Sequence, residues 1–355
     1  MTGSSGKILG GFLGILAWAG LSVAPLAAAH AEEIRDFENQ FDKTFGTEPR
    51  VPQIVQVPRT PQTFQVPSAP RSYSSPLEAR IAAVAGHDRG RIGVAAVDLS
   101  TGKAIQILGD QPFPMASTSK IAIVATFLEG VDQGRFRLDQ RFPLMVPVPS
   151  RKFDGPIAPV RAGQLLTARS LIELAITRSD NQATDALLAA VGGPQAVNRW
   201  LAGAGIHDFR IDRDIATLVR DDGAIDPAVT IDPRDSATPV AMVKLIGGLY
   251  RGQWLRPSSR AVLLGAMERC ITGKRRIRAR LPDGVTVAHK TGSLNNTSSD
   301  VGIIKMPDGR ALAVAIYVTG QGSRPNREVR IATIAREIYD GYLSDGSNSR
   351  RTAAR

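Results

Sequence analysis

Apolar and polar positions follow different patterns in different parts of the chain, and each pattern predicts a different kind of element. Short runs rich in Val, Ile and Ala occupy residues 91–99 and 104–108 and are joined by a turn-like Ser-Thr-Gly-Lys segment. Similar runs return at residues 285–289, 300–305 and 311–318. Short apolar runs bounded by turn residues are typical of β-strands. We therefore expect strands at both ends of the folded region.

Helical spacing of apolar residues dominates the middle of the chain. Residues 116–130 predict a buried helix, because apolar side chains occupy nearly every side of it. Further helices are expected at residues 77–84, 168–177, 181–190, 194–202, 237–249 and 327–342. Strands at both ends with helices between them predict an α+β fold, in which helices flank one antiparallel sheet and an all-helical lobe is inserted. A cleft between sheet and lobe is a natural place for a site.

The beginning of the chain has the pattern of a secretory signal peptide over residues 1–31. Lys7 is followed by an apolar run at residues 8–23, and Ala29-His30-Ala31 forms a small-x-small cleavage site before Glu32. The run is shorter than the roughly 20 apolar residues that span a bilayer. This pattern predicts a cleaved signal and a periplasmic or secreted protein, with an uncleaved anchor as the alternative.

Prolines recur from Pro49 to Pro76 and favour extended conformations, since proline fixes φ and lacks an N–H donor. Residues 32–75 are therefore predicted to be a Pro-rich linker, with a short polar helix at 34–45. The catalytic domain is expected at residues 76–345. Residues 346–355 are expected to form a flexible basic tail.

Composition narrows the possible partners. The 355 residues are 43% hydrophobic and 22% charged, with a net charge of +11, which predicts weak attraction to anionic envelope surfaces. The basic residues are scattered, so nucleic acid is not expected. The single cysteine, Cys270, has no intrachain partner, and no His, Asp and Cys cluster has metal-ligand spacing. We expect a monomer with no metal or other cofactor.

Three short motifs carry candidate chemistry. In the first, Ser117-Thr118-Ser119-Lys120, the serine and lysine share one helical face, and burial can lower the lysine pKa until it accepts a proton. A serine hydroxyl needs such a base to become a nucleophile. Residues 100–103 also match Ser-x-x-Lys, but they lie in a glycine-containing turn where the lysine need not face the serine.

The other two motifs are Ser179-Asp180-Asn181 and Lys290-Thr291-Gly292-Ser293. Taken alone, the second motif is also a good helix cap. The third follows a strand-like run, where it can form a turn or present an ammonium and hydroxyls to a carboxylate.

In this order the three motifs resemble those of the class A β-lactamases among the penicillin-recognising serine hydrolases. The likeness extends over residues 77–343 and is clearest at 115–130, 179–194, 234–242 and 288–293. It implies a covalent acyl-enzyme on Ser117, with Lys120 as general base and Ser179 relaying a proton to the lactam nitrogen. It also implies that the backbone N–H groups of Ser117 and Ser293 form an oxyanion hole. Substrate would be bound by Asn181, Lys290, Thr291 and Ser293.

One departure from the family pattern concerns the step that releases the acyl group. A loop begins with Arg210-Ile211-Asp212-Arg213 and closes with Arg234-Asp235, so Arg213 and Asp235 are expected to pair. The family's water-activating glutamate would stand at Ile215, and no glutamate occurs between 210 and 235. Val219 stands in the approximate place of the family's asparagine. Deacylation is expected to be slow or to use a substitute, with Asp214, Asp221 and Asp222 as candidates.

Two other functions remain open for the same acylation residues. One is a penicillin-binding peptidase or esterase acting on peptidoglycan-derived substrates. The other is a penicillin-binding sensor or envelope-binding protein that is acylated without turnover. A Ser-His-Asp hydrolase is disfavoured, because His87, His207 and His289 do not occur in a suitable context. We interpret His289 as a packed or rim residue beside Lys290.

Overall fold

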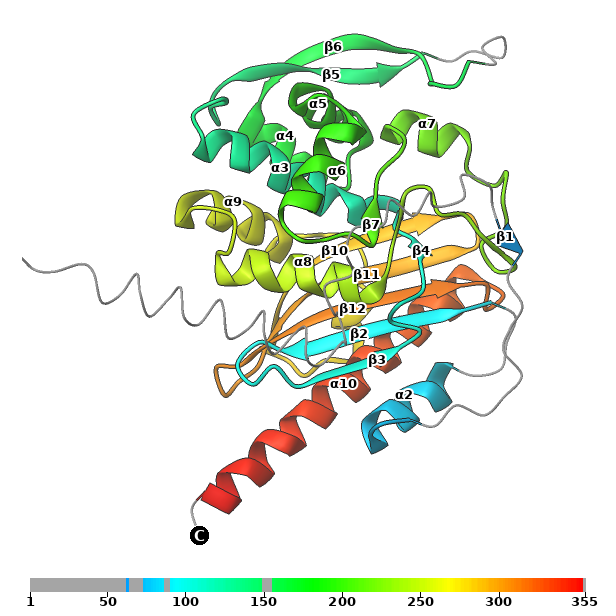
Figure 1. The fold of residues 1–355 in the computed structure, drawn as a ribbon, viewed down its shortest axis with the longest axis vertical. Helices are drawn as coiled ribbons and strands as arrows, with labels where there is room; N and C mark the ends of the chain where they lie inside the picture. The colour runs from blue at the N-terminus through cyan, green and yellow to red at the C-terminus, as the bar shows by residue number, and fades with distance from the viewer. Residues whose placement is uncertain (1–61, 64–72, 86–89, 149–154, 354–355) are drawn as a thin grey trace, which may run out of the picture.

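The computed structural model describes residues 62–63, 73–85, 90–148 and 155–353. They form a layer built on a β-sheet and a helical lobe stacked against it (Figure 1). The predicted signal peptide, the polar helix expected at 34–45 and most of the predicted linker lie outside the described residues. None of the helices in these ranges is long and apolar enough to cross a membrane.

One five-stranded antiparallel sheet forms the centre of the fold. Its strand order is β10 (Thr286–Leu294), β11 (Thr297–Lys305), β12 (Ala311–Thr319), β2 (Ile92–Asp98) and β3 (Ala104–Ile107). Side chains alternate between the faces of β2, so that Val97 packs in one hydrophobic core and Val94 in the other. The first hairpin therefore joins the last three strands, as the sequence predicts.

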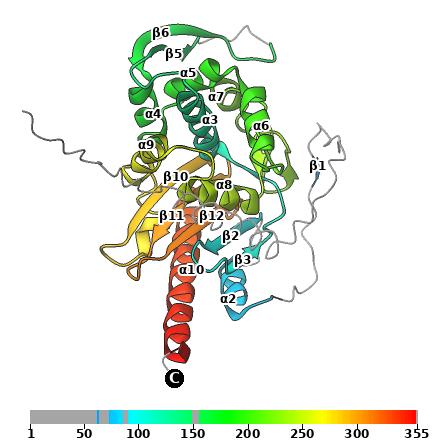
Figure 2. The same cartoon turned by 60° about the vertical axis from the view of Figure 1, so that its left-hand side comes forward.

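Helices cover both faces of this sheet. On one face, α2 (Pro76–Ala85) packs beside α10 (Arg324–Ala353), which also contacts the short 3₁₀ helix η2 (Ile277–Arg280). On the other face, α8 (Pro239–Arg251) lies over the central strands and α9 (Pro257–Glu268) lies against β10 (Figures 1 and 2). Because both faces are buried, the central strands are continuous apolar runs.

The helical lobe is built around α3 (Lys120–Asp132), which follows the 3₁₀ turn η1 (Ala116–Ser119). It packs against α4 (Ala168–Thr177), α5 (Asn181–Val191) and α6 (Pro194–Gly203). Side-chain caps set the helix starts: Thr167 accepts from the Ser170 N–H, and Asp180 from the Ala183 N–H. Gly192, with φ of 99°, ends α5 in the left-handed region that favours glycine.

The prediction of a mainly helical middle is wrong at one hairpin. β5 (Arg141–Pro147) and β6 (Val160–Thr167) form an antiparallel pair beside α5, with a register shift between Pro143 and Met145. Both strands are half-buried or exposed, so their sequence lacks the continuous apolar run of the central strands. The helices α7 (Ile215–Arg220) and α9 were also missed, and α10 extends beyond the predicted residues 327–342 at both ends.

Short strands fix the loop that spans residues 210–235. β7 (Phe209–Arg210) and β4 (Phe113–Pro114) both pair with β9 (Ser236–Ala237), so the two ends of the loop lie side by side. Within the loop, β8 (Thr230–Ile231) pairs with β1 (Gln62–Thr63), two residues of the predicted linker. The loop is thus held at its neck, next to the segment that leads into η1.

Candidate active site

The three predicted motifs converge where the helical lobe meets the edge strand β10. Ser117 lies in η1, Ser179 and Asn181 lie at the start of α5, and Lys290 to Ser293 lie on β10. Gly292 allows the closest approach between these elements: an added β-carbon would lie 2.5 Å from the carbonyl oxygen of Met115. The end of β10 is therefore in direct contact with the turn that presents Ser117.

A strained turn presents Ser117. Ala116, immediately before it, has φ of 49°, a left-handed conformation that non-glycine residues rarely adopt. The hydroxyls of Thr118 and Ser119 donate to the carbonyls of Met115 and Ala116 at 2.8 Å and hold the turn closed. Ser117 is half-buried, whereas its neighbours Thr118 and Ser119 are buried. Strain of this kind is concentrated at functional sites.

Lys120 is completely buried behind this turn. Its Nζ donates to the carbonyl oxygen of Ser179 at 2.7 Å and to Asn181 Oδ1 at 2.7 Å, and it lies 3.4 Å from Ser179 Oγ. Within the described residues, none of its hydrogen bonds reaches Ser117. Burial and the positive charge of Lys290 place the Lys120 pKa well below its ordinary value, although Asp185 and Asp180 oppose the shift. An amine with a lowered pKa can be neutral and accept a proton.

Ser179 lies between two lysines. Its Oγ accepts a hydrogen bond from Lys290 Nζ at 2.9 Å on one side and from Lys120 on the other. Ser179 also has a positive φ, 60°, a left-handed conformation that non-glycine residues rarely adopt. This arrangement connects the two ammonium groups through a single hydroxyl, which can relay a proton.

Lys290 is fully buried on β10, and burial lowers its pKa to about 8, with Cys270 and Asp300 opposing the shift. The hydroxyl of Thr291 lies 2.6 Å from that of Thr272. The exposed Ser293 lies two residues further along the strand. Because the side chains of Thr291 and Ser293 point to the same face of β10, they can bind one group together.

Arg276 is a residue of this site that the sequence analysis missed. Its guanidinium is 1% exposed and donates to the carbonyls of Gly292 and Ser299 at 2.8 Å and to Ser293 Oγ at 2.6 Å. It also pairs with Glu328 of α10 at 3.3 Å. The guanidinium adds positive charge beside Ser293, so this end of β10 favours an anionic ligand. Basic residues surround Arg276 in the sequence, and none of their spacings distinguishes it.

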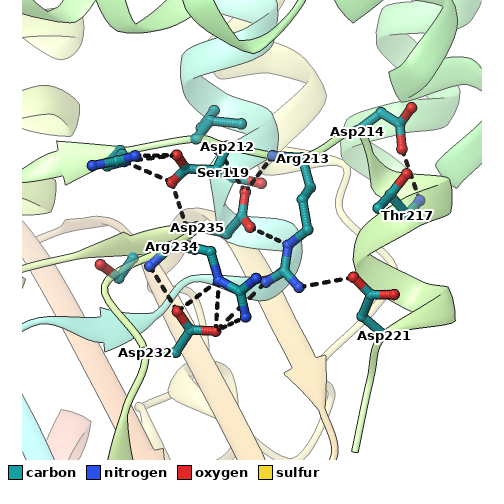
Figure 3. A network of polar contacts seen from close by, with 12 residues as sticks. Ser119, Asp212, Arg213, Asp214, Thr217, Asp221, Asp232, Arg234 and Asp235 are labelled. Carbon is teal, nitrogen blue, oxygen red and sulfur yellow. Dashed lines mark hydrogen bonds and ion pairs between the residues drawn. The ribbon is translucent and has the colours of Figure 1, made fainter. Parts of the chain in front are cut away.

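The neck of the 210–235 loop is closed by ion pairs (Figure 3). Arg213 Nε donates to Asp235 Oδ2 at 2.6 Å, which confirms the predicted pair. Asp235 Oδ1 also accepts from the backbone N–H groups of Asp212 and Arg213. Asp235 is buried, and Arg213 is 15% exposed on its side chain. The carboxylate therefore holds both a buried cation and the backbone of the loop.

Replacing Asp235 with alanine should lower the free energy of unfolding by about 1–3 kcal/mol, because the N–H groups of Asp212 and Arg213 lose their acceptor while Arg213 keeps Asp221 as a partner. Urea denaturation would measure the loss. Asp139→Ala is the matched control, since Asp139 pairs with Arg137 in full solvent, and its unfolding midpoint should stay nearly unchanged. Equal effects of the two substitutions would contradict this role of the neck.

Ile215 starts α7, and its side chain belongs to the hydrophobic core, with 3% exposure. The three aspartates considered as substitutes are each engaged within the loop or at its border. Asp214 Oδ1 caps α7 by accepting from the Thr217 N–H at 2.7 Å (Figure 3). Asp221 pairs with Arg213 and Arg220, and Asp222 accepts from the Asn295 N–H. Their carboxylates therefore stabilise the loop.

A different carboxylate, that of Asp185 on α5, lies behind Ile215. Asp185 is 5% exposed, and its two oxygens accept from the backbone N–H groups of Ile215 at 2.7 Å and Ala216 at 2.9 Å. It lines a cavity of about 260 Å³ together with Asn181, Val219 and Arg220. The sequence analysis did not consider it, because it lies outside the loop.

Two further residues lie beside the site but form no hydrogen bond with the hydroxyls of Ser117, Ser179 or Ser293. His289 is fully buried, as expected for a packed residue, and its Nδ1 lies 2.8 Å from Asp300 Oδ1. Cys270 is a buried free thiol 3.2 Å from the Thr272 hydroxyl. In the part of the chain that the structure describes, no group of three or more His, Cys, Asp or Glu residues could hold a metal ion.

Known proteins are similar in sequence to most of this chain. The model of a family described as the beta-lactamase enzyme family matches residues 76–342. The chain is 33% identical over 271 residues to beta-lactamase CTX-M-25 of Escherichia coli, covering 75% of this chain and 89% of that protein. It is 32% identical over 272 residues to CTX-M-8 of Citrobacter amalonaticus, with the same coverage.

Solved structures show the same likeness. The class A beta-lactamase of the last common ancestor of Gram-negative bacteria matches with a TM-score of 0.65 at 33% identity, covering 76% of this chain and 100% of that chain. A beta-lactamase from Chitinophaga pinensis matches with a TM-score of 0.66 at 27% identity, with the same coverage. The described fold thus has a counterpart over the full length of these structures.

Proposed function

The chain belongs to the class A beta-lactamase family of serine hydrolases, and we propose that it opens β-lactams through an acyl-enzyme on Ser117 that is hydrolysed slowly. The observation that carries this proposal is the position of Ser179 Oγ between Lys120 Nζ and Lys290 Nζ, beside the strained turn that presents Ser117. A nucleophile, a lysine with a lowered pKa and a relay hydroxyl are the groups that acylation requires.

In the first step, neutral Lys120 takes the proton of Ser117 as the serine oxygen attacks the lactam carbonyl. The proton then passes through Ser179 to the lactam nitrogen as the ring C–N bond breaks. The backbone N–H groups of Ser117 and Ser293 would bind the oxyanion, since the contact between β10 and η1 brings these segments together. Loss of one such donor typically costs about 3–4 kcal/mol of transition-state stabilisation.

Substrate orientation would come from both sides of the cleft. Lys290, Thr291 and Ser293 would bind the substrate carboxylate, supported by the buried charge of Arg276. On the opposite side, Lys120 holds the Oδ1 of Asn181, which leaves the Asn181 amide N–H groups for the carbonyl of the substrate side chain. The family's substrate class, a small molecule with an amide, a strained ring and a carboxylate, fits these donors.

The slow second step follows from the loop. Ile215 stands where the resemblance places a water-activating glutamate, and its buried hydrocarbon side chain cannot accept a proton. The loop aspartates are held by caps and ion pairs. The acyl group should therefore form quickly and leave slowly.

Intact mass spectrometry of the protein mixed with benzylpenicillin tests this function. We expect a rapid mass increase of one penicillin per chain, followed by slow return to the original mass with release of the ring-opened acid. An adduct that never decays would identify an acylated binding protein without turnover. A chain that neither gains mass nor consumes penicillin would refute the acyl-enzyme itself.

The acylation rate should also depend on pH through Lys290. Burial lowers its pKa to about 8, so its ammonium is charged below that pH and loses its charge as the pH rises through it. The second-order rate constant for acylation reports the free enzyme and should fall above about pH 8. Stopped-flow measurements between neutral and alkaline pH would show this fall in the acylation rate constant. In Lys290→Arg the fall in rate should occur at higher pH, because arginine keeps its charge. If the fall stays at the same pH, another group causes it.

We also propose that the chain is exported with cleavage before Glu32, which places it where β-lactams and cell-wall fragments occur. Residues 32–75 would then be a linker ahead of the catalytic domain. The net charge of +11 supports weak attraction to anionic envelope surfaces around a monomeric enzyme.

A further inference from the structure

Asp185 has no role in the three motifs, yet it lies against the backbone of Ile215 and interacts electrostatically with Lys120. It is on α5, one helical turn after Asn181, and the two residues face the same cavity of about 260 Å³. Asn181 Oδ1 is bonded to Lys120 Nζ, which follows Ser117 by one turn. Lys120 therefore contacts Asn181 directly and interacts electrostatically with the Asp185 carboxylate.

Asp185 contacts the backbone of residue 215, where the family's water-activating glutamate would stand. Its Oδ1 accepts from the Ile215 N–H and its Oδ2 from the Ala216 N–H. A glutamate at position 215 would extend from the same backbone that donates to Asp185. Each carboxylate oxygen has two lone pairs, so one hydrogen bond to each oxygen leaves acceptor capacity for water.

We propose that Asp185 is the proton acceptor for the water that hydrolyses the acyl-enzyme, in place of the missing loop glutamate; this inference rests on the proposed function. Asp185 draws the proton directly or through one bridging water, a range over which general bases act. Because the carboxylate lies behind the backbone of Ile215, it acts from a less direct position than a loop side chain would, which agrees with slow release.

The step balances without any co-reactant. The water oxygen bonds to the acyl carbon while one water proton moves to the Asp185 carboxylate. The tetrahedral intermediate then collapses and the bond from the acyl carbon to Ser117 Oγ breaks. The proton on Asp185 passes to neutral Lys120, and Lys120 donates a proton to Ser117 Oγ. An ester and a water thus give a carboxylic acid and free serine.

The environment of Asp185 suits a base near neutral pH. Burial raises its pKa to about 6, opposed chiefly by its two backbone hydrogen bonds, so the carboxylate is charged above that pH and protonated below it. Asp214 of the α7 cap adds to this rise and Lys120 of α3 opposes it. Arg220 of α7 shares the cavity, to which β5 contributes only Met145 and Pro147.

Other charged groups on the helices that pack against α5 are directed elsewhere. On α4, Glu173 pairs with Arg269 of α9. The arginines on or directly after α4 and α6 are exposed to solvent; these are Arg169, Arg178 and Arg199. Because the pKa of Lys120 is also lowered, an inflection near pH 6 reports Asp185 only if it disappears in Asp185→Asn.

The test measures deacylation separately from acylation, in full-length protein and with benzylpenicillin as the probe. After a short pulse, excess penicillin is destroyed and the decay of the acyl-enzyme is followed by intact mass between pH 4.5 and about pH 8. In the wild type, decay should quicken with rising pH through an apparent pKa near 6. In Asp185→Asn, decay should be about 10²-fold slower and independent of pH, with little change in acylation.

Two further variants separate a proton acceptor from a structural residue. Asp214→Asn also removes a carboxylate beside Ile215 but keeps the helix cap, so its decay should match the wild type. Asp185→Glu keeps the acid and should retain the pH dependence even if decay is slower. Unchanged decay in Asp185→Asn, or an inflection near pH 6 that survives it, overturns this inference while acylation still supports the function. A wild type that is never acylated overturns both.

Discussion

Replacing Ser117 with alanine should abolish covalent labelling by β-lactams and reduce turnover by on the order of 10³-fold or more. The reason is positional. Ser117 lies in the turn that contacts β10, with Lys120 buried one turn further along. Alanine removes the only atom that forms the acyl bond and leaves the binding groups on β10 in place. Mass spectrometry after exposure to benzylpenicillin measures the labelled fraction.

Ser100→Ala is the control, because residues 100–103 carry the same Ser-x-x-Lys pattern. In the structure, Ser100 is exposed in the turn between β2 and β3, where its hydroxyl donates to Asp98 Oδ1 at 2.6 Å. Labelling of this variant should equal that of the wild type. If labelling persists in Ser117→Ala, the assignment of the nucleophile is wrong, and a peptide map of the adduct would locate the residue that carries it.

The central sheet and the main helices could be predicted from the sequence, because burial and helix caps leave recognisable patterns in neighbouring residues. The central strands β2 and β12 are buried on both faces, so their apolar runs are nearly continuous. The α4 helix was predicted at its observed bounds, 168–177, because Thr167 caps it and its apolar stripe is regular. The β5–β6 hairpin was not predicted, since its half-buried strands and Pro143 weaken the alternation on which the prediction depends.

The motif residues were found because each motif combines chemistry with a local signal such as a helix start or a strand end. Arg276 and Asp185 lack such a signal. Arg276 lies among other basic residues in the sequence. It is distinguished only by its tertiary contacts, with Glu328 of α10 and with the Gly292 carbonyl of β10. Asp185 is significant because the 210–235 loop folds back onto α5 and offers it two N–H groups. Contacts between segments distant in sequence leave no pattern in either segment alone.

The structure also explains why the loop aspartates are poor candidates for the group that activates water. From sequence alone, Asp214, Asp221 and Asp222 are close to position 215 and look available. In the structure Asp214 caps a helix and Asp221 forms ion pairs (Figure 3), while Asp222 accepts from a backbone N–H. Unlike Asp185, none of the three lines the cavity beside Asn181. These contacts stabilise the loop, so replacing one of the three with a residue that cannot accept the same hydrogen bond would disturb the loop's shape.

Replacing Ile215 with glutamate should accelerate deacylation by about 10²-fold or more, since general-base catalysis commonly contributes about 10²–10⁴-fold. The backbone N–H of this residue is fixed by Asp185, so the new side chain would start from a defined position beside the site. The acylated fraction at steady state should fall, while the acylation rate constant changes little.

Ile215→Gln is the matched control, because glutamine has nearly the same shape but cannot take a proton from water. Both substitutions put a polar group into a core position with 3% exposure, so both should lower the unfolding midpoint to a similar extent. Only the glutamate should lower the acylated fraction. If the glutamine variant deacylates as fast, the change comes from a loosened loop. If the wild type already turns over rapidly with no accumulated adduct, a base is in place without glutamate, and its loss in Asp185→Asn would identify it.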